Sequence, residues 1–238
     1  MTAKRLQRNA ILAQLPEREY SQLEPQLRLE QLELKHPAYE PGKPISDIYF
    51  PLSAVFSLVA VVDGHHSLEV ATIGHEGMVG LPVYLGASSS PQAAFCQVSG
   101  EAARLTVADF RQALARDGAL HTLLNRFTQA TMVQVAQNVV CNGTHSTEAR
   151  MARWLLTTRD RVDSNELRLT QEFLAQMLGV HRPTVSDTAQ RIQEQGLISY
   201  RRGVITITDR PGLEAKACEC YRIVKAEFDA IRNHDGRG

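Results

Sequence analysis

The sequence predicts an α+β protein: an N-terminal β-barrel or jelly roll, a long helix, and a C-terminal helical domain that includes a β-hairpin. Three observations predict this class. Residues 32–105 form short β-branched segments separated by Gly and Pro, residues 119–142 carry apolar side chains at helical spacing, and residues 169–209 join two short helical patterns to two alternating ones. The expected parts are residues 1–117, 118–142 and 143–238.

The N-terminal part begins with a helical pattern over residues 5–30, interrupted by Pro16 and Pro25. We expect helix there, broken or kinked at the prolines. Further along, Asp63-Gly64 and residues 39–42 are turn sequences between apolar runs. Several short strands with turns at regular spacing are typical of a small barrel or jelly roll.

The long helix over residues 119–142 carries two apolar lines. One follows a spacing of alternating four and three residues, which is typical of a helix–helix seam. We assign this line to a dimer contact: Leu120, Leu124, Phe127, Thr131, Gln134, Asn138 and Cys141. A second line runs through Met132, Val135, Ala136 and Val139. The alternative is a helix packed wholly against its own barrel. Asn142-Gly143 is the expected hinge before a helix with Trp154 and Leu155 in its core.

Residues 169–209 predict a winged helix-turn-helix. Thr170 can cap a first helix, and Gly179 can adopt the left-handed conformation that turns the chain. In the second helix, Val185, Ala189 and Ile192 form a buried stripe. Two alternating strands follow, joined at residues 201–203, and form the hairpin called the wing.

Such a motif reads DNA because the major groove admits one helix, whose N-terminal residues reach base edges. Hydroxyls, helix N-termini and wing arginines suit phosphates. The candidate DNA contacts are Thr170, Gln171, His181, Arg182, Pro183, Thr184, Ser186, Asp187, Gln190, Arg191, Arg201 and Arg202. The alternative is a helical hairpin with solvated arginines inside some other domain.

Composition sets further limits. The formal net charge is zero, so attraction to DNA must come from local placement of charge. The charged N-terminus, the scattered cysteines and the lack of a membrane-length apolar run predict a cytoplasmic protein with reduced thiols. In a single last helix from residue 210, Cys218 and Cys220 would lie on different faces, one in the core and one at the surface.

No catalytic constellation, cofactor motif or metal site is expected. His65, His66 and His75 fall in turns, where exposed histidines are common. The sequence GHEG at residues 74–77 lacks the second histidine of a metal-protease motif. We therefore expect a protein that is not an enzyme.

The chain resembles the Crp/Fnr family of bacterial transcription regulators over nearly its whole length. The resemblance is strongest in EVATIGHEGMVGLPVYLG (residues 69–86), in the EARMARWLL segment (148–156) and in LTQEFLAQMLGVHRPTVSDTAQRIQEQGLI (169–198). It implies a cyclic-nucleotide-binding-like barrel and a homodimer joined through the long helices. The C-terminal winged helix-turn-helix domain of each subunit, called the head below, would bind one half of a pseudo-palindromic operator. It also implies a signal sensed by the barrel.

The sequence departs from the family's cyclic-nucleotide-binding members. They carry an acidic residue after the glycine here numbered Gly77, where this chain has Met78, and no arginine lies between Arg28 and Arg104 to meet a phosphate. A buried phosphate without a cation is costly. We expect a degenerate effector pocket formed by Gly77, Met78, Val79, Gly80, Pro91, Gln92, Val135 and Ala136. In the recognition helix, Pro183 and Asp187 replace the family's usual guanine-reading pattern.

The function expected from the resemblance is sequence-specific DNA binding by a homodimer, independent of cyclic nucleotide. Two alternatives stay open: a ligand-sensing barrel that acts mainly by protein contact, and a cyclic-nucleotide-responsive regulator with an atypical pocket. The expected partners are double-stranded DNA and a second copy of the chain. RNA polymerase and an unidentified small-molecule effector are the remaining candidate partners, and no membrane is expected.

Overall fold

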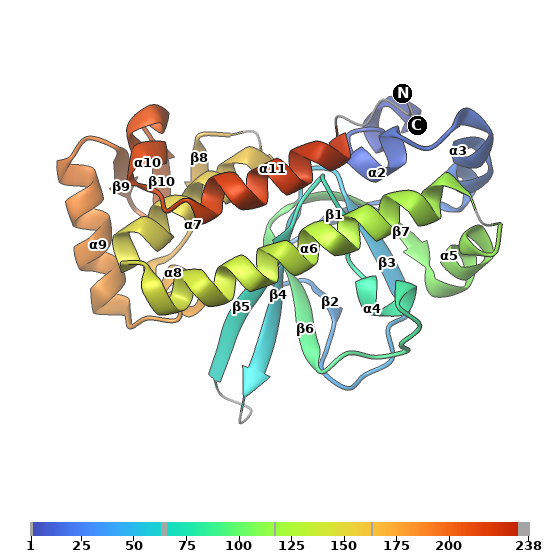
Figure 1. Cartoon of the computed structure of the whole chain (residues 1–238), viewed down its shortest axis with the longest axis horizontal. Helices are drawn as coiled ribbons and strands as arrows, with labels where there is room; N and C mark the ends of the chain where they lie inside the picture. Colours follow the sequence, from blue (N-terminus) through green and yellow to red (C-terminus); the bar gives the residue numbers. More distant parts are fainter. Residues whose placement is uncertain (1, 63–65, 117, 163, 233–238) are drawn as a thin grey trace.

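The N-terminal half folds into two antiparallel sheets that enclose an apolar core. The computed structural model describes residues 2–62, 66–116, 118–162 and 164–232 (Figure 1). One sheet has the strand order β1-β7-β3 and the other β2-β6-β4-β5. The strands are β1 (Arg28–Leu32), β2 (Pro37–Tyr39), β3 (Asp47–Pro51), β4 (Val55–Val62), β5 (His66–Ile73), β6 (Gln92–Val98) and β7 (Gly100–Thr106). This β domain agrees with the predicted β-barrel or jelly roll.

Short helices border the β domain. They are α1 (Thr2–Leu6), α2 (Ala10–Ala13), α3 (Glu17–Leu23), the 3-10 helix η1 (Glu24–Gln26), α4 (Leu81–Tyr84) and α5 (Val107–Leu114). The prediction of helix up to residue 30 is wrong at its end. The helical stretch ends with η1 at Gln26, and β1 then pairs with β7 from Arg28 to Leu32. Backbone pairing with a distant strand decided this segment, which local spacing could not reveal.

The long helix α6 (Ala119–Thr144) has 26 residues and continues through the predicted hinge. Gly143 lies within the helix, which ends at the cap residue His145. The helix α7 (Thr147–Val162) follows almost at once. The turn between them, at residues 145–146, is thus three residues further along than the sequence indicated.

The C-terminal head contains the two helices of the predicted motif, α8 (Gln171–Leu178) and α9 (Arg182–Glu194). Its three-stranded sheet has the order β8-β10-β9 and consists of β8 (Glu166–Arg168), β9 (Ile198–Arg201) and β10 (Val204–Ile207). The wing is confirmed as a hairpin, and β8 is a strand that the sequence analysis did not predict.

The single last helix that we predicted is two helices, α10 (Arg210–Lys216) and α11 (Cys220–Arg232). The chain turns at residues 217–219, so Cys218 lies between the helices and Cys220 begins α11. Both cysteines are buried, at 9% and 1% exposure. The expectation that one of them lies at the surface is therefore wrong, because it assumed an unbroken helix.

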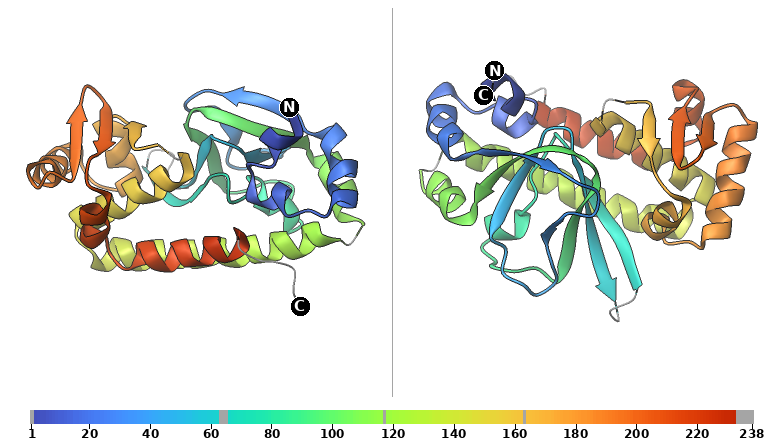
Figure 2. Two further views of the ribbon diagram at one scale, coloured as in Figure 1. Left: turned by 90° about the horizontal axis from the view of Figure 1, so that it is seen from above. Right: turned by 180° about the vertical axis from the view of Figure 1, so that it is seen from behind.

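The helices α6 and α11 lie side by side and form one layer (Figure 1). The β domain and the head lie next to each other on the same side of this layer (Figure 2). The predicted α+β class is confirmed. The predicted turn at Asp63-Gly64, His65 and the tail after Arg232 lie outside the described residues. Among the described helices, none is long and apolar enough to cross a membrane.

Candidate nucleic-acid interface

The two helices of the motif are held at a fixed angle by their caps and their shared core. The Thr170 hydroxyl accepts a hydrogen bond from the Phe173 amide at 3.1 Å, as an N-cap does. Gly179 ends α8 with φ of 62°, a conformation that glycine adopts without strain. Leu174 and Val185 are fully buried at the contact between the helices. The sequence predicted the cap at Thr170, the turn at Gly179 and the burial of Val185.

Most of the candidate DNA contacts are exposed, and five of them lie on α9. Nine of the twelve residues are exposed: Thr170, His181, Arg182, Pro183, Asp187, Gln190, Arg191, Arg201 and Arg202. Gln171, Thr184 and Ser186 are half-buried, and the Ser186 hydroxyl donates to the Gln171 side chain at 2.8 Å. This bond ties α9 to the start of α8, so Ser186 and Gln171 stabilise the motif in the free protein.

The second half of α9 makes contacts within the head. The Gln190 amide donates to Glu194 at 2.9 Å, and the Arg191 guanidinium lies 3.7 Å from Glu148 of α7. These contacts direct the two side chains away from the start of the helix. Arg182, in the first turn, is the cationic side chain that projects where a recognition helix meets base edges.

The wing adds a second basic group. Arg202 and Gly203 both have positive φ, 50° and 77°, which is the geometry of a two-residue hairpin turn. Arg201 precedes the turn and pairs with Val204, whose other neighbour across the sheet is Arg168. Residues opposite one another in neighbouring strands share a face, so Arg168 and Arg201 lie on one side of the sheet.

Arg168 is a candidate contact that the sequence reasoning missed. It is exposed, while Leu167 and Leu169 on either side are 2% and 3% exposed. This alternation is the period of a strand and was the signal that could have revealed β8.

The head is docked on the β domain through the side of α8 away from α9. The Phe173 ring lies 6.5 Å from Phe95 of β6 and 6.4 Å from Trp154 of α7. Trp154 donates its indole N–H to Glu69 of β5 at 2.7 Å, and the Gln176 amide donates to Ser67 at 2.8 Å. The contact joins the sheet of the β domain directly to the DNA-binding motif.

Glu69 is the electrostatic centre of this contact. Its side chain is 7% exposed, and burial raises its pKa from 4.5 to about 7. Hydrogen bonds from Ser57 and Trp154, and the charges of Arg153 and Arg161, oppose that rise. Ser57 lies 2.6 Å from both Glu69 and Gln97. A hydroxyl has one hydrogen, so Ser57 can donate to only one of these two oxygens at a time.

The predicted dimer seam of α6 is placed differently from our expectation. All seven residues are buried within their own chain, from 0% for Leu124 and Phe127 to 8% for Asn138. Gln134 and Asn138 donate hydrogen bonds to Thr72 and the Val70 carbonyl of β5. This line therefore packs α6 on its own β domain, because its polar members find partners on β5.

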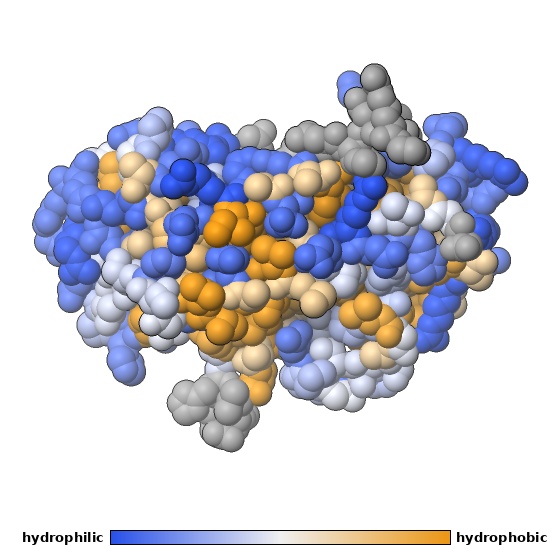
Figure 3. Space-filling view, in the orientation of Figure 1, coloured by the Kyte–Doolittle hydropathy of each residue, from blue (hydrophilic) through white to orange (hydrophobic). Residues whose placement is uncertain are grey.

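The opposite face of α6 is exposed and apolar. Met132, Val139 and Val140 are 63%, 70% and 48% exposed, and Ile223 of the adjacent α11 is 38% exposed. Figure 3 shows apolar side chains gathered over the middle of α6 and α11. Thus the second line that the sequence contained, which includes Met132 and Val139, faces outward.

The residues predicted for the effector pocket differ widely in exposure. Met78 and Val79 are fully buried, while Pro91 and Ala136 are exposed. Phe127 of α6 packs on Gly77 so closely that a Cβ there would lie 2.1 Å from the ring. Neither of the two cavities described for residues 2–62, 66–116, 118–162 and 164–232 is lined by any of the eight.

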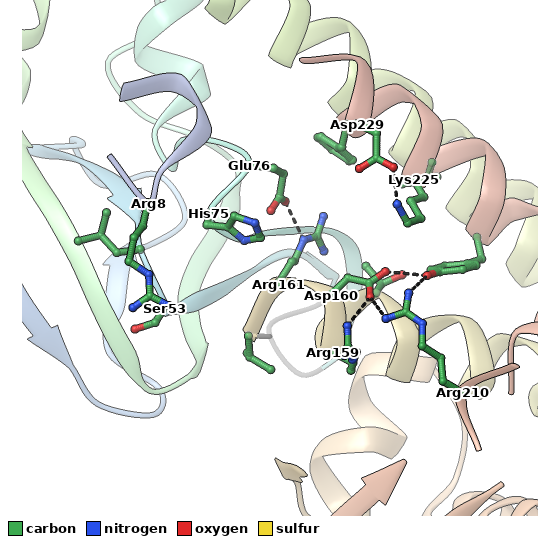
Figure 4. Close-up of a pocket in the computed structure, with 16 residues that line it drawn as sticks. Arg8, Ser53, His75, Glu76, Arg159, Asp160, Arg161, Arg210, Lys225 and Asp229 are labelled. Atoms are coloured by element: carbon green, nitrogen blue, oxygen red, sulfur yellow. Dashed lines mark hydrogen bonds and ion pairs between the residues drawn. The ribbon is translucent and has the colours of Figure 1, made fainter. Parts of the chain in front are cut away.

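A cleft of about 480 Å³ lies instead between the β domain, α7 and α11 (Figure 4). Its charged walls are largely paired: Arg161 with Glu76 at 2.7 Å, Arg210 with Asp160 at 2.9 Å, and Lys225 with Asp229. Arg161 of α7 is 6% exposed and its guanidinium lies over the Phe228 ring at 5.6 Å. The cleft thus contains a buried ion pair that joins the head to the β domain.

A β domain, a long helix and a winged helix-turn-helix head together make up the architecture of the described residues. Residues 149–216 match the profile of the Crp-like helix-turn-helix domain. The chain therefore contains a Crp-like DNA-binding head, and its predicted resemblance to the Crp/Fnr family is confirmed.

Solved structures of three other proteins share this fold over about four-fifths of the chain. FixK2 from Bradyrhizobium japonicum matches with a TM-score of 0.68 and 15% identity, over 81% of this chain and 98% of FixK2. A CRP-family transcriptional regulator from Thermus thermophilus, TTHB099, matches with a TM-score of 0.65 and 18% identity. The match covers 79% of this chain and 96% of TTHB099. The c-di-GMP-responsive regulator CLP of Xanthomonas campestris matches with a TM-score of 0.64 and 16% identity. The match covers 81% of this chain and 99% of CLP. No curated protein matches the sequence.

Proposed function

We propose that the protein is a homodimeric transcription regulator that binds a pseudo-palindromic operator through α9 and the wing. The observation that carries this proposal is the placement of Arg182 at the exposed start of α9. A recognition helix reads bases with these residues, and arginine can bond bidentately to guanine. Arg168 of β8 and the wing residues Arg201 and Arg202 suit the neighbouring phosphates.

The dimer that we propose uses the exposed faces of α6 and α11 rather than the seam predicted from the sequence. Exposed positions on α6 recur every three or four residues: Thr122, Asn125, Gln129, Met132, Ala136, Val139 and Gly143. This is the spacing of a paired helix, and α6 is about 39 Å long at 1.5 Å per residue. Ile223, Ala226 and Ala230 extend the exposed apolar surface onto α11.

A second copy of the chain is the occupant that fits this surface. The surface runs along the neighbouring helices α6 and α11, near the middle of one face of the molecule (Figure 3). A twofold axis there can pair α6 with α6 of the second copy. Such pairing would place two recognition helices for half-sites about 34 Å apart, one turn of DNA.

Cyclic nucleotide is not the effector in this proposal. Phe127 fills the space beside Gly77, and Met78 stands where binding members of the family carry an acidic residue. Regulation then depends on the pose of the head against β5, which Trp154 and Arg161 hold. RNA polymerase remains the partner expected of a regulator bound at a promoter.

The test is binding of the purified protein to DNA fragments selected from a random library, followed by Arg182→Ala. If Arg182 reads a base, the variant should lose roughly 1–3 kcal/mol, about 5- to 150-fold in Kd, on the selected site. Arg18→Ala, an exposed arginine on α3, is the matched control and should bind like the parent.

Salt dependence distinguishes this function from the alternative of protein contact alone. Phosphate contacts release counterions, so affinity for DNA should fall steeply between low and physiological salt. If no fragment is enriched, and binding is weak and insensitive to salt, the head does not act on DNA. Equal affinity of Arg182→Ala and the parent would remove Arg182 from the interface.

A further inference from the structure

Four side chains of metal-ligand type meet where α6, α7, α10 and α11 adjoin. Cys141 lies in the last turn of α6 and His145 directly follows that helix, while Cys218 and Cys220 lie at the turn into α11. Their ligand atoms all lie within 4.8 Å of one another. The three cysteines are buried and unbridged, and His145 is half-buried.

The distances within this cluster match those of one tetrahedral ion. The sulfurs of Cys141 and Cys218 are 3.4 Å apart, and Cys220 Sγ is 3.6 Å from Nδ1 of His145. With Zn–S near 2.3 Å and Zn–N near 2.0–2.1 Å, a tetrahedron has S–S edges of about 3.8 Å and S–N edges of about 3.5 Å. We propose that Cys141, His145, Cys218 and Cys220 form a Cys₃His site for Zn²⁺.

The charges around the cluster favour such a complex. Zn²⁺ with three thiolates and a neutral imidazole carries one net negative charge, which needs a nearby cation when buried. Arg153 of α7 interacts electrostatically with all three cysteines, and Arg150 with Cys141 and Cys218. The Nε atoms of both arginines are buried without a hydrogen-bond partner among the described residues. These two guanidinium groups supply the compensating charge.

Four protein ligands leave no open position, so the site is structural rather than catalytic. His145 lies in the link between α6 and α7, and Cys218 in the link between α10 and α11. One ion would therefore fix both connections of the head to the α6–α11 layer. The metal site does not rest on the proposal of DNA binding, since it depends only on side chains at these links.

The site is tested with Co²⁺, whose tetrahedral thiolate complexes have intense visible bands and a near-ultraviolet charge-transfer band. Reduced, metal-free, full-length protein should bind one Co²⁺ per chain with this spectrum, and Zn²⁺ should displace it. Loss of even an outer-shell partner typically weakens metal binding by about 10- to 100-fold, so Cys218→Ala and Cys220→Ala should lose more than about 100-fold. Zn²⁺ should also raise the Tm of the parent.

The fourth cysteine provides the matched control. Cys96 is equally buried, but it lies in β6 and its thiol donates to the Val98 carbonyl. Cys96→Ala should therefore bind Co²⁺ like the parent. Circular dichroism identifies any variant that fails to fold, and Cys218→Ser then replaces Cys218→Ala.

Three outcomes overturn the proposal. The first is a folded, reduced parent protein that shows no tetrahedral cobalt spectrum. The second is equal Co²⁺ affinity in the parent and in both cluster variants. The third is a Cys141–Cys218 disulfide that forms in air at the same rate with and without Zn²⁺, which would identify the cluster as a thiol pair.

Discussion

Glu69 makes the contact between the head and the β domain sensitive to pH. Its carboxyl receives the indole N–H of Trp154, and burial raises its pKa from 4.5 to about 7. The perturbation is Glu69→Gln, which keeps an oxygen to accept from Trp154 and removes the titration. The variant therefore separates the charge of this side chain from its shape.

Stability falls as pH rises because the unfolded chain loses the Glu69 proton at a lower pH than the folded chain does. Below pH 4.5 Glu69 is protonated in both the folded and the unfolded chain. Between pH 4.5 and about 7 the unfolded chain ionises while the folded chain keeps its proton, so stability falls as pH rises. A tenfold change in proton affinity corresponds to about 1.4 kcal/mol. The free energy of unfolding should therefore fall by about 2–3 kcal/mol between pH 5 and pH 8.

The assay is urea unfolding of the parent and of Glu69→Gln between pH 5 and pH 8. From pH 5 to pH 8, the free energy of unfolding of the variant should rise by about 2–3 kcal/mol relative to that of the parent. Trp154 is the single tryptophan, so its fluorescence should titrate with a midpoint near pH 7 in the parent and not in the variant. Glu33→Gln, on an exposed loop, is the control. Stability curves that stay parallel across the range would refute the reasoning.

Three further predictions concern packing, capping and assembly. Gly77→Ala places a methyl group 2.1 Å from the Phe127 ring and should destabilise the protein by about 1–3 kcal/mol in chemical unfolding; unchanged stability would show that Phe127 moves freely. Thr170→Ala removes the hydroxyl that accepts from Phe173 and should cost about 0.5–2 kcal/mol, most of it restored by Thr170→Ser; an equal loss in both variants would exclude a capping role. Val139→Glu should convert a dimer into a monomer in sedimentation equilibrium, whereas Val61→Glu, on the exposed side of β4, should not; a dimer that persists in Val139→Glu would place the interface elsewhere.

The ion pair between Arg161 and Glu76 and the hydrogen bond between Trp154 and Glu69 act on the same helix. Arg161 pairs with Glu76 in the segment that follows β5, Trp154 donates to Glu69 within β5, and both contacts are buried. A change at the sheet would therefore reach the head through α7, because a buried charge that loses its partner is strongly unfavourable. This arrangement gives a physical route between the β domain and the DNA-binding motif.

The sequence by itself determined the local structure of the head. The cap at Thr170, the turn at Gly179 and the buried Val185 follow from side-chain size, hydrogen-bonding capacity and backbone freedom within a few residues. The same holds for the wing turn, where Gly203 adopts positive φ. These features needed no information about distant parts of the chain.

Only the tertiary structure decided which face of α6 meets which surface. The spacing identified two lines but could not distinguish them, since both repeat every three or four residues. Gln134 and Asn138 pair with β5, and this long-range contact turns their line inward and leaves Met132 and Val139 outside. Likewise, Cys141 and Cys218 are 77 residues apart and meet only because α10 and α11 are separate helices. Local chemistry defines helices, caps and turns, whereas partnership between distant surfaces depends on how those elements pack.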